Sequence, residues 1–187
     1  IIAIVAVVLL VFIPYSWVKG TYNGFVRAQE GVSKAWSDVE STYQRRADLI
    51  PNLVETVKGY ASHEKGTFEA VVEARSKAMN ATGPAAAAEA ENMLTGALKS
   101  LFALSENYPE LRASENFAGL QSTLSSLEDA IQKARRYYNA VVRDYNTKVG
   151  QVPTNLVART FGFREREFFE ATGGEREVPN VDFGGGA

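Results

Sequence analysis

The sequence predicts an all-α protein in which an N-terminal transmembrane helix leads into an elongated antiparallel bundle of the four-helix kind. Three observations predict it. The middle of the 187-residue chain is rich in Ala, Leu, Glu, Arg, Lys and Gln, which favour helix. Apolar residues recur there at spacings of three, four and seven, as on one face of a helix. Glycine is concentrated at junctions and in the last fifteen residues, so few breaks interrupt long helices.

Residues 1–18 form the predicted anchor because they contain no charged side chain. A helix of this length reaches about 27 Å, close to the hydrocarbon thickness of roughly 30 Å. Tyr15, Trp17 and Lys19 follow in the order typical of a membrane interface. A cleaved signal peptide is the alternative, but bulky residues and no small-x-small cleavage site follow the apolar run. A soluble buried helix is less favoured, because apolar residues occupy every face.

The next predicted helix has nearly four heptads of apolar stripe. The stripe consists of Phe25, Val32, Trp36, Val39, Tyr43 and Ile50, and Gln29 and Arg46 fill its missing positions. This pattern allows the membrane helix to continue into the bundle.

Pro51 interrupts this pattern, and two predictions follow. In the first, Asp48 caps a new helix with Pro51 in its first turn, where a missing N–H costs nothing. In the second, one long helix kinks at Pro51. In both cases a stripe that includes Glu64 and Arg75 continues to about Met79. The stretch 80–84, Asn-Ala-Thr-Gly-Pro, ends this helix.

The second half of the chain predicts two further long helices. One runs over residues 85–106 and ends at Asn107-Tyr108-Pro109; the other is capped by Ser114 and runs to about Gly150. Pro153 restarts the chain, and residues 154–171 predict one or two short helices. We expect an anchor at 1–20, a bundle domain at 21–171 and an irregular Gly-rich tail at 172–187.

Composition excludes several function classes. The net charge of −2 argues against a nucleic-acid binder, which normally has a basic excess. Without cysteine there is no disulfide, thiolate metal site or Cys nucleophile. His63-Glu64 begins like a zinc-protease motif, but His63 is the single histidine. Paired Glu-x-x-His motifs, a phosphate loop and a nucleophile elbow are also missing. We predict no enzyme, no cofactor and no metal.

Polar residues within the apolar stripes are the first interaction candidates. They are Gln29, Arg46, Glu64, Arg75, Glu128 and Arg135. Because a buried charge needs a partner, we expect Glu40, Glu64 and Glu128 to pair with the arginines. Such pairs would set the register of the bundle. The alternative is an interhelical solute site lined by Arg46, Arg75 and Arg135.

Tyrosine–asparagine pairs are the second candidates. They are Tyr22-Asn23, Tyr138-Asn139 and Tyr145-Asn146. Amphipathic tyrosine rings suit helix interfaces in which the hydroxyl reaches a polar partner. We expect packing within one chain, with lateral contact between protomers as the alternative.

Several segments together resemble the LemA family. They are the apolar N-terminus, YNGFVRAQEGVSKAWSDVE from Tyr22, QRRADLIPNLVETVKGYASHE from Gln44, ENYPELRASENFAGLQ from Glu106, ARRYYNAVVRDYN from Ala134 and VPTNLVA from Val152. The resemblance covers residues 1–169 and implies a membrane-anchored, elongated helical bundle without established enzymatic activity. The family defines no catalytic set to carry over.

These observations together predict a single-pass scaffold in the bacterial inner membrane, with the side of its helical part left open. The expected partners are the lipid bilayer, further copies of the chain and other membrane proteins, but not nucleic acid. Membrane confinement favours weak contacts between copies because it raises their local concentration. The alternative is a membrane-tethered sensor or solute-binding module.

Overall fold

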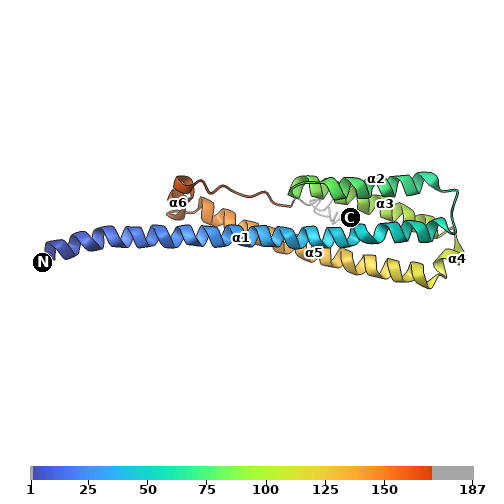
Figure 1. The fold of residues 1–187 in the computed structure, drawn as a ribbon, viewed down its shortest axis with the longest axis horizontal. Helices are drawn as coiled ribbons and strands as arrows, with labels where there is room; N and C mark the ends of the chain where they lie inside the picture. The colour runs from blue at the N-terminus through green and yellow to red at the C-terminus, as the bar shows by residue number, and fades with distance from the viewer. Residues whose placement is uncertain (1, 170–187) are drawn as a thin grey trace, which may run out of the picture. The chain divides into compact units, whose positions relative to one another are not determined.

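The computed structural model describes residues 2–169, apart from the side chains of residues 3–7. This part of the chain forms helices and no strand, which confirms the all-α prediction (Figure 1). The helices are α1 (Ile2–Lys58), α2 (Lys65–Asn80), α3 (Pro84–Ser105), α4 (Pro109–Arg112), α5 (Glu115–Gly150) and α6 (Thr154–Phe161). The predicted tail at 172–187 lies outside the described residues.

The helices divide between two compact units. Of the described residues, unit 1 comprises 2–42 and 128–168, and unit 2 comprises 43–127 and 169. Helices α1 and α5 each contribute one part to each unit. The predicted domain boundaries at residues 20 and 171 are not the boundaries of these units, and they stay predictions.

In unit 1, α1 and α5 pack antiparallel. The ring of Phe25 lies 6.3 Å from that of Tyr145, and the ring of Trp36 lies 5.3 Å from that of Tyr138. Between these two contacts, a Cβ at Gly31 would lie 3.8 Å from Val141. Residue numbers therefore rise along α1 as they fall along α5, as expected for an antiparallel pair.

Buried residues on both long helices recur at intervals of seven. On α1 they are Phe25, Val32, Val39, Arg46 and Leu53, and on α5 they are Phe117, Leu124, Ile131, Tyr138 and Tyr145. A strict interval of seven is the period of a coiled coil. The predicted stripe of α1 is thus confirmed, and Arg46 occupies a position that is otherwise apolar.

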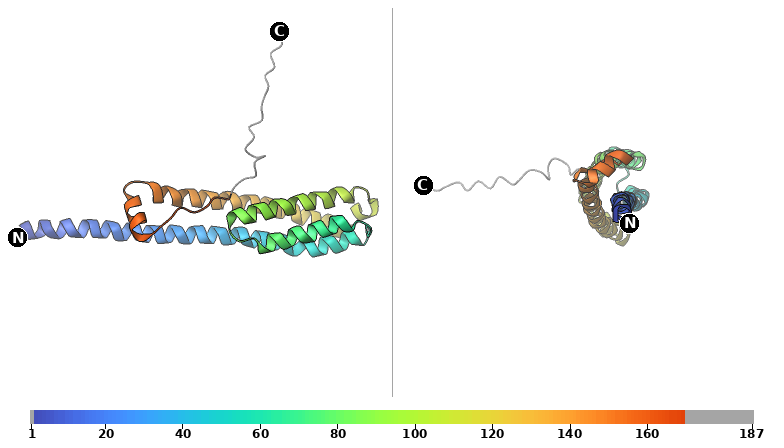
Figure 2. Two further views of the ribbon diagram at one scale, coloured as in Figure 1. Left: turned by 90° about the horizontal axis from the view of Figure 1, so that it is seen from above. Right: turned by 90° about the vertical axis from the view of Figure 1, so that its left-hand side faces the viewer.

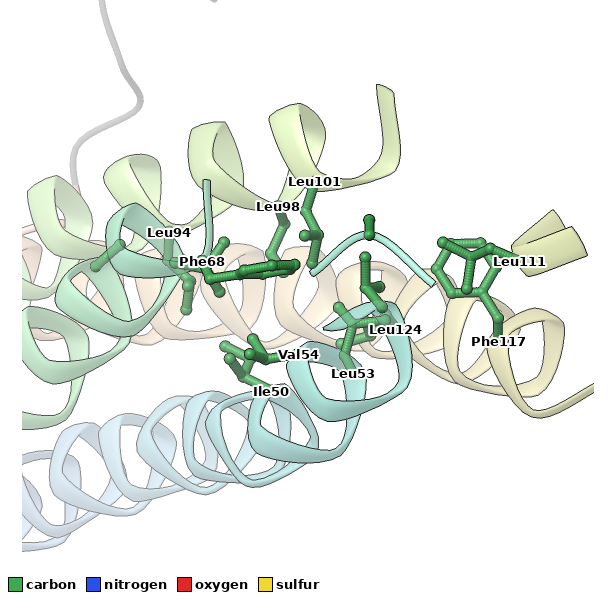
Figure 3. Packing of buried hydrophobic residues seen from close by; sticks show 14 residues of the cluster. Ile50, Leu53, Val54, Phe68, Leu94, Leu98, Leu101, Leu111, Phe117 and Leu124 are labelled. Atoms are coloured by element: carbon green, nitrogen blue, oxygen red, sulfur yellow. The ribbon is translucent and has the colours of Figure 1, made fainter. Parts of the chain in front are cut away.

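Unit 2 contains an apolar core to which α1, α2, α3, α4 and α5 all contribute. Figure 3 shows Leu53, Phe68 and Leu98 pointing toward one another from α1, α2 and α3. Leu111 of α4 and Phe117 of α5 lie in the same cluster. Full burial of each such side chain stabilises the fold by about 1.5–3 kcal/mol.

The predicted boundaries of the middle helices are partly wrong. Helix α1 ends at Lys58, and the chain turns before α2 begins at Lys65, whereas the sequence pattern predicted one helix up to Met79. Tyr60, predicted on the buried stripe, is 43% exposed in this turn. Two glycines, at 59 and 66, flank the turn, and glycine weakens a helix by about 1 kcal/mol relative to alanine.

The other helix ends agree better with prediction. Helices α3 and α5 begin and end within one residue of the predicted bounds, and the Phe117 N–H donates to Ser114 Oγ at the start of α5. Helix α4 was not predicted. Helix α6 is the one short helix described after Pro153, where one or two were predicted; it ends at Phe161, and its C-cap is Gly162, whose φ of 76° suits glycine.

The predicted transmembrane helix is not confirmed. In the part of the chain that the structure describes, no helix combines the length and the apolar character needed to cross a membrane. The side chains of residues 1 and 3–7, which belong to the predicted span, lie outside the described part.

Candidate functional site

The most deeply buried polar group of unit 2 is an ion pair between α1 and α3. The side chains of Arg46 and Glu91 are 2% and 1% exposed, and Nη2 of Arg46 meets Oε2 of Glu91. Nη1 of Arg46 also donates to Oγ1 of Thr95, at 3.2 Å. Because Glu91 and Thr95 lie four residues apart on one helix, both face the same arginine. The pair therefore ties a single position of α1 to one turn of α3.

A buried ion pair of this kind is weak evidence for net stability. Two charges lose their hydration on burial, so a buried pair is often no more stable than apolar residues of the same volume. Any other register would leave the two charges unpaired in an apolar core, at a cost of several kcal/mol. The contact provides a buried carboxylate partner for Arg46, and the role of Arg46 in setting the register stays a prediction.

Glu91, which pairs with Arg46, was not among the carboxylates predicted from the sequence to pair with the arginines. Of the carboxylates that were predicted, Glu40 accepts a hydrogen bond from Trp36 Nε1 at 2.7 Å, and Glu64 accepts one from the Tyr108 hydroxyl at 3.4 Å. A signal for Glu91 existed, because it lies three residues before the buried Leu94 and so on the apolar stripe of α3.

Pro51 lies inside α1, which continues to Lys58, so no new helix starts there. Proline has no N–H and therefore leaves the carbonyl of residue 47 without its usual helical donor. Nε of Arg75 donates to that carbonyl, at 2.8 Å. An arginine of α2 thus replaces the hydrogen bond that Pro51 removes from α1, so Arg75 compensates for Pro51.

Asp48 does not act as a helix cap, which corrects one of the two predictions for this region. It lies within α1, is exposed, and accepts a hydrogen bond from Gln44 Nε2 at 2.7 Å. Glu64 lies at the N-cap position of α2 and makes no side-chain cap hydrogen bond, so its predicted place on a continuous helical stripe is wrong.

In unit 1 a tyrosine and an asparagine of α5 hold an extended segment, residues 163–168, that follows α6. The Tyr138 hydroxyl donates to the Glu167 carbonyl at 2.9 Å. The Asn146 amide donates to the Arg166 carbonyl and accepts from the Arg166 N–H, both at 2.8 Å. The amide of Asn146 therefore pairs with the backbone of residue 166 as a neighbouring strand would.

Burial changes the acidity of two tyrosines in this unit. It raises the pKa of Tyr138 and Tyr145 above the ordinary value, and the positive charge of Arg166 partly opposes the rise. Neutral hydroxyls suit hydrogen bonding to a backbone carbonyl. The contacts of Tyr138 and Asn146 agree with the expected packing within one chain.

The remaining candidates lie half-buried in unit 1. They are Gln29 on α1 and Glu128, Arg135 and Asn139 on α5. Glu128 Oε1 accepts a hydrogen bond from Gln132 Nε2 at 3.0 Å. Of the three arginines proposed for a solute site, Arg46 and Arg75 belong to unit 2 and Arg135 to unit 1.

A metal site would need ligating side chains from the described residues that lie close together. Among them, no three His, Asp or Glu side chains lie close enough to hold a metal ion. His63 is exposed in the turn between α1 and α2. The contacts that the fold makes with the candidate residues include those of Arg46 with Glu91, Arg75 with the carbonyl of residue 47, and Asn146 with the backbone of Arg166.

Comparison with known proteins shows which proteins this chain is similar to. Protein LemA of Metamycoplasma hominis is 28% identical over 179 residues, which are 94% of this chain and 78% of that protein. Magnetosome protein MamQ 2 of Paramagnetospirillum magneticum is 27% identical over 175 residues, 80% of this chain and 64% of that protein. Magnetosome protein MamQ of Magnetospirillum gryphiswaldense is 26% identical over 174 residues, with 79% of this chain and 64% of that protein covered.

The chain therefore spans less than two thirds of the magnetosome proteins' length. None of these relatives' names states an enzymatic activity. Residues 35–183 match the LemA family, a stretch that includes Arg46, Pro51, Arg75, Glu91 and Asn146. Since this match covers well over half of the sequence, the chain belongs to the LemA family.

Proposed function

We propose that this chain is a single-pass membrane-anchored protein whose helical part works as a self-associating scaffold and catalyses no reaction. Its membership of the LemA family and the non-catalytic names of its relatives support the absence of chemistry. Two of those relatives are named as proteins of the magnetosome. A bacterial membrane, with other membrane proteins as further partners, is the proposed location.

The observation that carries the proposal is the exposed apolar surface at the start of α1. From Val8 to Ile13, every side chain is apolar and between 49% and 75% exposed. Six consecutive residues go more than once around a helix, so apolar groups face every direction. A helix that is apolar all round requires an apolar environment. Lipid is the environment that fits a segment followed by Trp17 and Lys19.

The continuity of α1 connects this segment to the rest of unit 1. The helix runs without interruption from Ile2 through the last α1 residue of unit 1, Thr42. Gly20 lies within regular helix. Insertion of residues 1–18 would therefore hold unit 1 close to the bilayer.

Self-association is the second part of the proposal. Val72 and Met79 lie seven residues apart on α2 and are 54% and 43% exposed, so one face of this helix presents apolar side chains. Molecules confined to a membrane meet at high effective concentration, and small contacts of this kind then suffice. The contacts of Arg46 and Arg75 favour the scaffold over a solute-binding module, because both guanidinium groups are engaged within unit 2.

The anchor is tested by flotation with zwitterionic vesicles. The full chain is compared with a chain that starts at Lys19 and with a Leu10→Arg/Phe12→Arg variant. Each arginine at the centre of a span costs about 2.5–3.5 kcal/mol. We expect the full chain to float and to resist a salt and alkaline carbonate wash, and the other two to stay in the dense fractions. A full chain that stays in the dense fractions would refute the anchor.

A further inference from the structure

The short helix α6 and the segment just before it present large apolar side chains to solvent. Val157 and Ala158 are buried, whereas Leu156 and Phe161 are 60% and 50% exposed, and Val152 just before the helix is 73% exposed. Large apolar side chains grouped on a short surface helix indicate a binding face. The environment that covers this face follows from its position and its charge.

The position is next to the anchor. The rings of Phe161 and Phe163 lie 5.0 Å and 5.6 Å from the ring of Tyr22 on α1. Tyr22 lies five residues after Trp17, which is about 8 Å along a helix axis. Figure 2 shows α6, in red, beside the N-terminal half of α1. If residues 1–18 cross a bilayer, α6 lies at the level of the lipid headgroups.

The charge around α6 is positive. Residues 17–29 contain Lys19 and Arg27 and no carboxylate, and residues 145–164 contain Lys148, Arg159 and Arg164 and no carboxylate. All five of these basic side chains are exposed. The nearest carboxylates in sequence are those of Glu30, Asp144 and Glu165. A chain of net charge −2 thus has a basic region at the anchor end of unit 1.

From these observations we infer that α6 is an interfacial helix that binds the surface of an anionic phospholipid bilayer. Val152, Leu156 and Phe161 enter the boundary between headgroups and acyl chains, and Lys148 and Arg159 contact lipid phosphates. A short helix with exposed apolar side chains and basic flanks is suited to this position. The inference rests on the proposed anchor, and it adds a second membrane contact that orients unit 1 about the axis of α1.

The test uses single cysteines, because the chain has none of its own. Leu156→Cys probes α6, Leu10→Cys probes the anchor, and Ser33→Cys is the control. Ser33 is exposed on the same helix as the anchor and lies about 24 Å beyond Trp17. Each full-length variant is labelled with a solvent-sensitive fluorophore and reconstituted in phosphatidylcholine–phosphatidylglycerol vesicles that contain a lipid with a shallow nitroxide.

We expect the label at 156 to shift to the blue and to lose most of its fluorescence to the nitroxide, while the label at 33 stays water-like and unquenched. A water-like label at 156 together with a quenched label at 10 overturns the inference and leaves the anchor intact. A blue-shifted but unquenched label at 156 indicates a protein contact and also overturns it. Failure of the protein to float with the vesicles refutes the anchor itself.

The role of charge is tested with Lys148→Glu/Arg159→Glu in the Leu156→Cys background. We expect this change to reduce quenching at 156, and omission of phosphatidylglycerol to do the same for the parent protein. Lys133→Glu, at an exposed position on α5 in unit 1, is the matched control and should leave quenching unchanged. Equal quenching in all these cases would contradict binding to anionic headgroups.

Discussion

Single polar residues inside apolar stripes decide which helix positions face one another. Arg46 follows Val39 and precedes Leu53 in a series with an interval of seven, and it pairs with Glu91 of α3. We expect this pair to set the register of α1 against α3. The burial of Arg46 was predictable, because its position in the series is visible in the sequence. Its partner was not, because the choice among glutamates depends on which helices become neighbours.

Arg46→Ala is expected to destabilise the chain by about 3–5 kcal/mol, because it leaves the carboxylate of Glu91 buried without its partner. Arg46→Met/Glu91→Leu should recover most of this loss, because no charge then remains buried. Lys77→Ala, which removes an exposed partner of Glu73, is the control and should leave the unfolding midpoint nearly unchanged. Chemical unfolding followed by circular dichroism measures all three. A double variant as unstable as Arg46→Ala would contradict this explanation.

Pro51 and Arg75 are expected to be coupled in a double-mutant cycle. Arg75→Ala leaves the carbonyl of residue 47 without a donor, at a cost of about 1–3 kcal/mol. In a Pro51→Ala background the cost should be much smaller, because the N–H of the new alanine supplies the helical hydrogen bond. Ser76→Ala, at an exposed neighbouring position, should show no coupling with position 51. Additive effects of Pro51→Ala and Arg75→Ala would mean that the two residues act independently.

Stability should fall at alkaline pH partly through Tyr145. Burial raises the pKa of this side chain in the folded state, so above the ordinary value of about 10 the unfolded chain loses its proton first. The stabilisation that the protonated Tyr145 side chain contributes is therefore complete below that value. It is lost as pH rises through the higher, folded-state pKa. Tyr145→Phe should lose less stability than the wild type between about pH 9 and pH 11. Tyr137→Phe, at an exposed position, should follow the wild-type curve.

At the scale of elements, the apolar pattern was sufficient to predict the long helices but not the places where they are interrupted. The stripes of α1 and α5 and the cap at Ser114 follow local rules. The turn between Lys58 and Lys65 does not, because the apolar spacing continues through it and the packing of α2 in unit 2 outweighs that pattern. The extended segment after Gly162 was also not predicted, since its backbone is held by distant side chains of α5.

Asn146→Ala is expected to release that segment from α5, because it removes both hydrogen bonds to the backbone of Arg166. Amide exchange at Arg166 and tryptic cleavage after Arg164 and Arg166 should both become faster. Asn146→Asp keeps an acceptor but loses the donor, so its effect should be intermediate. Thr147→Ala, which removes a bond within α5 to the Arg143 carbonyl, serves as the control. Wild-type exchange in Asn146→Ala would show that other contacts hold the segment.

At the scale of the whole molecule, the chain combines a charge-free N-terminal segment, a basic region around α6 and an acidic remainder. This distribution, and the motifs of the LemA family, are properties of the sequence and were accessible from it. The proximity of α6 to Tyr22 was not, because residues 22 and 161 are brought together by the antiparallel packing of α1 and α5. Membrane attachment and self-association are properties of this level and cannot be assigned to any single residue.

The most direct test of the membrane-anchored, self-associating scaffold is the number of copies per particle in native nanodiscs. The full chain and a chain that starts at Lys19 are expressed in a bacterium, and the membrane and soluble fractions are analysed by mass photometry or photobleaching. We predict that the full chain is recovered from the membrane in particles with more than one copy, and the shortened chain from the soluble fraction. A full chain recovered only as single copies, or outside the membrane, would contradict the proposal.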